Sequence, residues 1–145
     1  MPDAESSPDS IEELELDSSV DSIIKAGEIA TRFARRVGLN EDDCYRLGLA
    51  VHEAVANAVI HGNRYAPDKR IHLRISARPD RVTVTIRDEG EGFDSSSAAD
   101  VPITGSLSRS GRGLLLIREL VDELYARHHD ALPGTEVCLT KHVRH

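Results

Sequence analysis

The sequence predicts an α+β domain, a two-layer sandwich with helices on one face of a mixed, mostly antiparallel sheet. Two helical segments follow one another in the first half of the chain, and two short segments of alternating apolar residues come after them. A further helix and a strand close the domain. This order lacks the regular strand–helix alternation of a doubly wound parallel sheet, so it favours helices layered on one side of a sheet.

A strand and a helix are expected near the N-terminus. Residues 13–17 alternate leucines with acidic residues, which indicates a short strand. A first helix should follow and reach about Val37, with Gly38 at a position where helices commonly end. Three polar residues stand where the N-cap of this helix belongs: Asp17, Ser18 and Ser19.

A second helix is predicted from Asn40 to about Ile60. Asn40 is a good N-cap residue, and Asp43 three positions later completes a loose capping box. Apolar and small residues recur along this segment at helical spacing and can form its buried stripe: Leu47, Ala50, Val51, Ala54 and Ala58.

The second half of the chain combines a hairpin, a long loop, a helix and a strand. Residues 71–76 and 82–86 alternate apolar and polar side chains, which indicates an antiparallel hairpin with one buried face. Residues 88–113 hold five glycines, and a loop this long in a compact domain is usually functional or mobile. Apolar residues then recur at helical spacing over 114–124, and residues 135–140 form a last strand.

Composition narrows the class of protein. The 145 residues correspond to a flexible N-terminal tail, 1–10, and a single folded domain, 11–145. The formal net charge of −7 argues against direct contact with nucleic acid, because phosphate binding needs clustered Lys and Arg. Cys44 and Cys138 are too few and too far apart for a disulfide framework. No apolar run approaches the ~20 residues that span a bilayer, so we expect a cytoplasmic protein without membrane contact.

Glu53 and Asn57 lie four residues apart on the second predicted helix, so they share one face, one turn apart. A carboxylate and an amide oxygen placed in this way could position a hydroxyl or ligate a hard cation. They could equally be part of an exposed polar stripe. A zinc-protease helix is disfavoured, because Ala56 stands where its second histidine would be.

Two glycine-containing segments can approach a ligand. Asp88, Gly90 and Gly92 closely follow the second strand of the hairpin, where a carboxylate could accept a hydrogen bond from an exocyclic amine such as that of adenine. Gly111 and Gly113 lie at the start of a predicted helix, whose free N–H groups and dipole suit phosphate. Taken singly, each segment could also be an ordinary turn.

Together, in this order, the three segments 53–57, 88–92 and 111–114 resemble the N, G1 and G2 boxes of the ATPase superfamily of DNA gyrase, a heat-shock chaperone, mismatch-repair ATPases and histidine kinases. Gly134 and Thr135 look like a further element of that pattern. The resemblance implies a Bergerat-type ATP-binding fold. The sequence Gly-x-x-x-x-Gly-Lys-Ser/Thr of P-loop nucleotide binders is absent.

Within this superfamily the sequence most resembles the anti-sigma factor serine/threonine kinases. Residues 53–63, 108–113 and 139–142 look like motifs of that family, and the resemblance extends over about 14–142. The chain departs from the pattern at Arg112, where a smaller or apolar residue is expected.

The resemblance implies a role for each matching position. Asn57 would bind the Mg²⁺ that bridges the ATP phosphates, and Glu53 would act as general base toward a partner hydroxyl. Asp88 would bind the adenine amino group, and Thr135 would support the adenine end. Arg109 would approach the γ-phosphate, although it could also be a solvated loop residue. Glycines would line the nucleotide pocket: Gly90, Gly92, Gly111 and Gly113.

The resemblance also implies partners. Such a kinase sequesters a sigma factor, phosphorylates a Ser or Thr of a small antagonist protein and commonly forms a homodimer. Residues 94–110 are expected to form a mobile lid. Glu53 and Asn57 together favour a kinase over the alternative, an ATP-binding regulatory module that sequesters a partner without phosphoryl transfer. A detached histidine-kinase catalytic domain is a third possibility, disfavoured by the Ser-Arg-Ser-Gly sequence at 108–111.

Overall fold

A computed structural model of the chain describes residues 10–90, 101–102, 111–128 and 134–143. The predictions on Gly92, Arg109, the tail before Ser10 and nearly all of the lid at 94–110 lie outside these residues.

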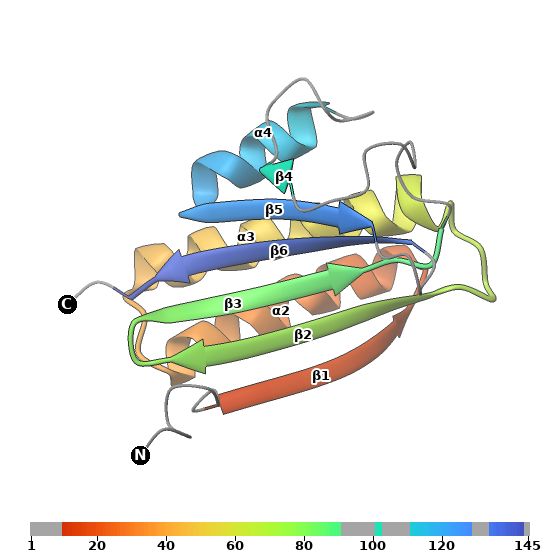
Figure 1. The fold of residues 1–145 in the computed structure, drawn as a ribbon. Coiled ribbons are helices and arrows are strands. Elements are labelled where there is room, and N and C mark those ends of the chain that lie inside the picture. The colour runs from red at the N-terminus through yellow and green to blue at the C-terminus, as the bar shows by residue number, and fades with distance from the viewer. Residues whose placement is uncertain (1–9, 91–100, 103–110, 129–133, 144–145) are drawn as a thin grey trace, which may run out of the picture.

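Helices cover one face of a sheet, which gives the molecule two layers (Figure 1). The strand order is β1-β2-β3-β6-β5-β4. The α+β fold class is confirmed. Every pairing among the described strands is antiparallel, so these strands do not form the mixed sheet that we expected. The elements are β1 (Ser10–Asp17), α2 (Val20–Arg36), α3 (Glu41–Asn57), η1 (Ala58–Gly62), β2 (Arg70–Arg78), β3 (Arg81–Arg87), β4 (Val101–Pro102), α4 (Gly111–Leu120), β5 (Glu123–His128) and β6 (Thr135–His142).

The ends of the first two helices follow local sequence signals. Ser19 caps α2 by accepting a hydrogen bond from the Ser22 N–H at 3.3 Å. Asn40 caps α3 in the same way, with its Oδ1 2.8 Å from the Asp43 nitrogen. Between the two helices Gly38 adopts a φ of 102°, a conformation that favours glycine. The predicted starts of both helices and the predicted end of the first are therefore confirmed.

The second helix changes its geometry before it ends. It is α-helical only to Asn57, and residues 58–62 form a π-helical turn, η1, in place of the continuous helix predicted to Ile60. The Asn63 N–H donates to the Ala58 carbonyl oxygen at 2.8 Å, five residues back along the chain. Short π-helical turns often occur at functional sites.

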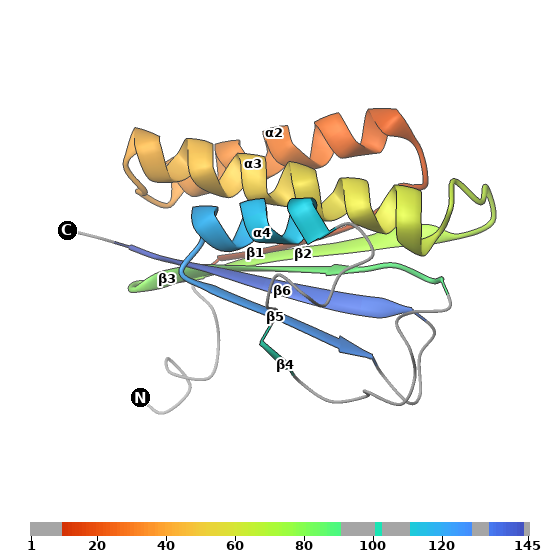
Figure 2. The same ribbon diagram turned by 90° about the horizontal axis from the view of Figure 1, so that it is seen from above.

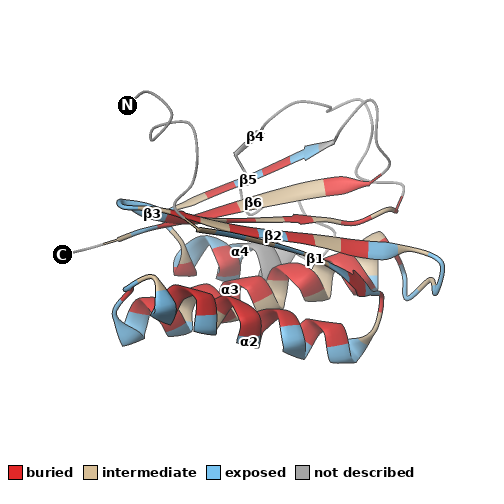
Figure 3. Ribbon diagram, turned by 90° about the horizontal axis from the view of Figure 1, so that it is seen from below, coloured by how far each residue is buried: buried red, intermediate tan, exposed pale blue. Residues whose placement is uncertain are grey.

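The sheet has one apolar and one polar face. Along β2 and β3 alternate residues are buried beneath the helices, as the hairpin pattern predicts (Figure 3). In β2 and β3 the side chains on the other face are mainly arginines, threonines and His72. β1 begins at Ser10, three residues before the predicted strand at 13–17, and pairs with the whole of β2 up to Ala77.

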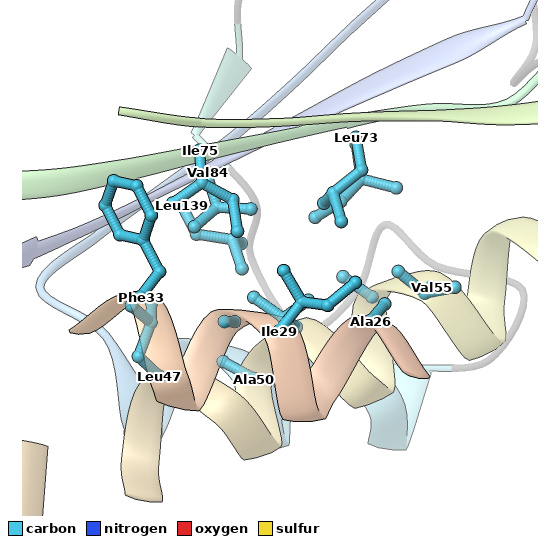
Figure 4. Packing of buried hydrophobic residues seen from close by; sticks show 14 of the residues in the cluster. Ala26, Ile29, Phe33, Leu47, Ala50, Val55, Leu73, Ile75, Val84 and Leu139 are labelled. Atoms are coloured by element: carbon cyan, nitrogen blue, oxygen red, sulfur yellow. The ribbon is translucent and has the colours of Figure 1, made fainter. Parts of the chain in front are cut away.

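The core fills the space between the helices and the apolar face of the sheet (Figure 4). Phe33 of α2 and Leu47 of α3 belong to one buried cluster with Ile75, Val84 and Leu139 of the strands, and all five are fully buried or nearly so. Full burial of a large apolar side chain stabilises a fold by about 1.5–3 kcal/mol. This layer fixes α3, which carries Glu53 and Asn57, against the sheet.

The helix predicted over 114–124 is wrong in its second half. α4 ends at Leu120, and residues 123–128 form strand β5 beside β6. Asp122 starts this pairing by donating its N–H to the Thr140 carbonyl oxygen at 2.9 Å. Leu124 continued the helical spacing of apolar residues, but it is buried as part of the period-two pattern that a strand requires.

The two cysteines are free thiols, Cys44 buried and Cys138 partly buried. Burial raises the pKa of both thiols above the usual value, which keeps them protonated at neutral pH. In the part of the chain that the structure describes, no helix is both long and apolar enough to cross a membrane.

Candidate functional site

Several predicted site residues gather near one edge of the sheet. β3 ends and β6 begins at this edge, since Arg87 pairs with Glu136. α3 and η1 also end there, because Gly62 lies against Asp88. The N-terminus of α4 points toward this edge (Figure 2). Its C-terminus leads to Asp122, which contacts Thr140 near the opposite end of β6.

Asp88 is the most constrained residue at this edge. Its side chain is buried, and Oδ1 accepts hydrogen bonds from the backbone N–H groups of Gly90 and Thr135, at 3.0 Å each. The Asp88 N–H in turn donates to the Thr135 carbonyl oxygen at 3.0 Å. The carboxylate therefore has a fixed direction. The structure brings three predicted site residues together here: Asp88, Gly90 and Thr135.

Three glycines make room for this arrangement. A Cβ on Gly62 would lie 2.1 Å from Asp88 Oδ2, and one on Gly90 would lie 2.0 Å from the Gly62 carbonyl oxygen. Gly134 has a φ of 95°, and a Cβ there would lie 1.8 Å from the Asp88 carbonyl oxygen. Real Cβ atoms do not approach so closely, so the backbone at all three positions depends on glycine. Of these three glycines the sequence assigns a role to Gly90 alone, although Gly62 and Gly134 both lie inside the matching motifs.

Glu53 and Asn57 occupy the last turns of α3. The Glu53 carboxylate oxygen Oε2 lies 3.2 Å from His52 Nδ1, and 29% of its side chain is exposed. Asn57 is the last α-helical residue before η1. The predicted spacing of one turn is therefore present, on the half of α3 that leads into the Gly62–Asp88 contact.

The phosphate side of the predicted site is described only in part. Gly111 and Gly113 form the first turn of α4, as expected for a helix N-terminus. The first N–H groups of a helix have no partner within it, so such a turn can bind an anion. The Arg112 side chain, together with Gly92 and Arg109, lies outside what the structure describes.

Glu89, which sequence reasoning passed over, anchors the segment next to Asp88. Its Oε1 accepts from the Arg70 N–H at 2.9 Å, and its Oε2 lies 2.6 Å from His72 Nε2. Burial raises the pKa of Glu89, but the hydrogen bonds from Arg70 and His72 outweigh burial and hold the pKa below its ordinary value of 4.5. No spacing rule reveals this contact, because β2 and the end of β3 meet only in the folded chain.

The available side-chain ligands limit how a metal ion could bind at this site. Within the residues that the structure describes, no group of three or more His, Cys, Asp or Glu side chains could hold one. Asn57 offers a single amide oxygen, a ligand that suits Mg²⁺. An ion at Asn57 would take its remaining ligands from phosphate oxygens and water, which fits Mg²⁺ that arrives with a nucleotide.

The profile of the family described as "Histidine kinase-like ATPase domain" matches residues 16–141. The matched region runs from the end of β1 to the penultimate residue of β6 and includes every candidate site residue named above. The chain therefore belongs to the histidine kinase-like ATPase domain family.

Two relatives show to which group within this family the chain is similar. Serine-protein kinase RsbW of Bacillus subtilis is 34% identical over 117 residues, which cover 76% of this chain and 71% of that protein. The anti-sigma F factor of Oceanobacillus iheyensis is 32% identical over 103 residues, covering 69% of this chain and 70% of that protein. Within the family, the chain belongs with the RsbW kinases and anti-sigma F factors.

A solved structure supports the fold. The crystal structure of the RsbU and RsbW domains of Rv1364c from Mycobacterium tuberculosis superposes with a TM-score of 0.68 and 20% sequence identity. The match covers 96% of this chain but only 34% of that longer chain. At this identity the similarity establishes the shared fold alone.

Proposed function

We propose that this protein is an ATP-dependent protein serine/threonine kinase that acts as an anti-sigma factor in a partner switch. It would sequester a sigma factor and phosphorylate a Ser or Thr of a small antagonist protein. The observation that carries the proposal is the fixed Asp88 carboxylate, held by backbone N–H groups at the edge toward which α3 and α4 both point. The relatives' names, serine-protein kinase and anti-sigma F factor, support the same function.

The adenine end of the proposed site is built around Asp88. Its carboxylate can accept a hydrogen bond from the adenine amino group, which guanine replaces by a carbonyl oxygen. Gly90 and Thr135 hold this carboxylate in place through their backbones. An acceptor with a fixed direction selects ATP over GTP, because a carboxylate facing a carbonyl would leave both groups without a hydrogen-bond donor.

The phosphate end uses α3 and α4. The first turn of α4, with Gly111 and Gly113, would bind phosphate oxygens through its N–H groups. Asn57 would hold Mg²⁺, which neutralises charge on the phosphates. Gly92 and Arg109 would complete the pocket, with the guanidinium stabilising charge on the transferred group.

Glu53 would serve as the general base. The partner hydroxyl oxygen forms a bond to the γ-phosphorus, the bond from that phosphorus to the β,γ-bridging oxygen breaks, and ADP leaves with the electron pair. The hydroxyl proton passes to the Glu53 carboxylate. Residues 11–145 would form the kinase domain, which would act in the cytoplasm as a homodimer.

A Glu53→Ala variant tests the chemistry. Since a positioned base contributes about 10²–10⁴-fold in rate, phosphorylation should fall by this factor while ATP affinity stays within about threefold. The assay uses radiolabelled ATP with the antagonist protein encoded nearest to this gene. Asp42→Ala, which removes an exposed carboxylate at the other end of α3, is the matched control. A wild type that binds ATP and its partner but transfers no label would instead support the non-catalytic binding module.

A further inference from the structure

Asn63 joins three separate parts of the chain through its side-chain amide. The residue is 2% exposed. Its Oδ1 accepts the Glu89 N–H at 2.7 Å. Its Nδ2 donates to the Ser18 hydroxyl oxygen at 2.9 Å and to the Arg70 carbonyl oxygen at 3.0 Å. One buried amide thus connects the junction of β1 and α2, the start of β2 and the segment that follows β3.

The contact with Ser18 is extended by a further hydrogen bond. The Ser18 hydroxyl donates to the Lys69 carbonyl oxygen at 2.6 Å, so its oxygen is left to accept from Asn63. Both protons of the Asn63 amide therefore have defined acceptors. An aspartate at this position would face the Arg70 carbonyl oxygen with a second acceptor, so the site requires the donor and acceptor pair that an amide provides.

The bond to the Glu89 N–H lies one residue from the recognition carboxylate. Three successive backbone N–H groups donate hydrogen bonds there. The Asp88 N–H donates to the Thr135 carbonyl oxygen, the Glu89 N–H to Asn63 Oδ1, and the Gly90 N–H to Asp88 Oδ1. The middle bond sets the orientation of the peptide between Asp88 and Glu89. This peptide in turn determines where the Asp88 side chain starts and whether Oδ1 can reach the other two donors.

We propose that Asn63 is a positioning residue for nucleotide selectivity, which holds the Asp88 carboxylate in the direction that distinguishes adenine from guanine. The inference rests on the proposed function of the Asp88 edge. Asn63 does not touch the ligand; it acts through the Glu89 N–H. A purely structural Asn63 would affect stability and would leave the preference for ATP over GTP unchanged.

The test compares the affinities of three variants and the wild type for ATP and GTP by calorimetry. In Asn63→Ala the ratio of the two affinities should fall about tenfold or more, equivalent to about 1.4 kcal/mol. This lies within the net contribution of a typical intramolecular hydrogen bond. Ser18→Ala keeps the bond to Glu89 and should change the ratio by less than about threefold. Asn40→Ala, which removes the α3 N-cap far from Asp88, should lower stability and leave the ratio unchanged.

The outcomes separate the two hypotheses. A wild type that binds no nucleotide overturns the proposed function and this inference with it. A wild type that prefers ATP, together with a folded Asn63→Ala variant of equal preference, overturns only the role of Asn63. If Asn63→Ala does not fold, hydrogen exchange of the wild type decides, because the Glu89 N–H should exchange slowly even without nucleotide. Fast exchange at Glu89 would refute the positioning role.

Discussion

A single methyl group added at Gly62 should displace the Asp88 carboxylate. In Gly62→Ala the new Cβ would lie 2.1 Å from Asp88 Oδ2 and 2.5 Å from Asp88 Cγ. The optimal separation of two non-bonded heavy atoms is about 3.5 Å, so the carboxylate must move by at least about 1 Å. It cannot make this movement and keep two Oδ1 hydrogen bonds that are already 3.0 Å long.

The magnitude follows from these two bonds. A hydrogen bond to a charged group contributes about 1.5–3 kcal/mol, so the loss of both should lower the free energy of unfolding by about 3 kcal/mol or more. For a domain of this size, such a loss lowers the Tm by roughly 10 °C. Binding of Mg-ATP at 100 times its Kd should raise the stability of the wild type by about 2.7 kcal/mol. This second effect should also be lost in the variant, because Asp88 no longer points to the adenine site.

Thermal melts with and without Mg-ATP measure both effects, and Gly38→Ala is the matched control. Gly38 also has a positive φ, 102°, but nothing lies within 4 Å of a Cβ added there. Its alanine variant should suffer only backbone strain, about 1–3 kcal/mol, and should keep the full nucleotide-dependent rise in Tm. The reasoning fails if Gly62→Ala melts at the wild-type temperature and is stabilised by nucleotide to the same extent.

Three further changes test neighbouring contacts. Asp88→Asn should weaken ATP binding and reduce the preference over GTP measured by calorimetry; an unchanged preference would exclude Asp88 as the adenine contact. Because the Glu89 pKa is held below 4.5, its contribution to stability is present above that pH and is lost as the pH falls through the lowered value. Glu89→Gln should therefore be less stable than the wild type in urea at pH 7, and this difference in stability should shrink as the pH is lowered below 4.5. A difference that stays constant as the pH falls would contradict this cause. Lys141→Ala removes the buried cation 3.4 Å from Asp43 and should cost about 3–5 kcal/mol in urea denaturation, whereas the exposed Arg35→Ala should have little effect.

Features that depend on neighbours in sequence could be predicted, and features that depend on distant segments could not. Ser19, Asn40 and Gly38 act on their own helix ends, so their signals are local and correct. The sequence did not predict β5, because the spacing from Leu120 to Leu124 also fits a helix. The segment becomes a strand by pairing with β6, which comes later in the chain. Gly62 and Asn63 lie inside the motif at 53–63, but their roles depend on Asp88 and Glu89, 26 residues away, so no local spacing reveals those roles.

The two ends of the proposed site should respond differently to substitution because they are built differently. The Asp88 end is fixed by backbone hydrogen bonds and by glycines that tolerate no side chain, so changes there should alter stability and nucleotide selectivity together. Glu53 lies on a continuous α-helix, and its hydrogen-bonding contact is with His52, its immediate neighbour in sequence. Its replacement leaves the backbone of α3 intact. A substitution at Glu53 should therefore abolish phosphoryl transfer and leave ATP selectivity intact, whereas substitutions at Asp88 or Gly62 should not. A kinase predicts this difference between the two ends of the site. A non-catalytic binding module predicts no phosphoryl transfer to lose.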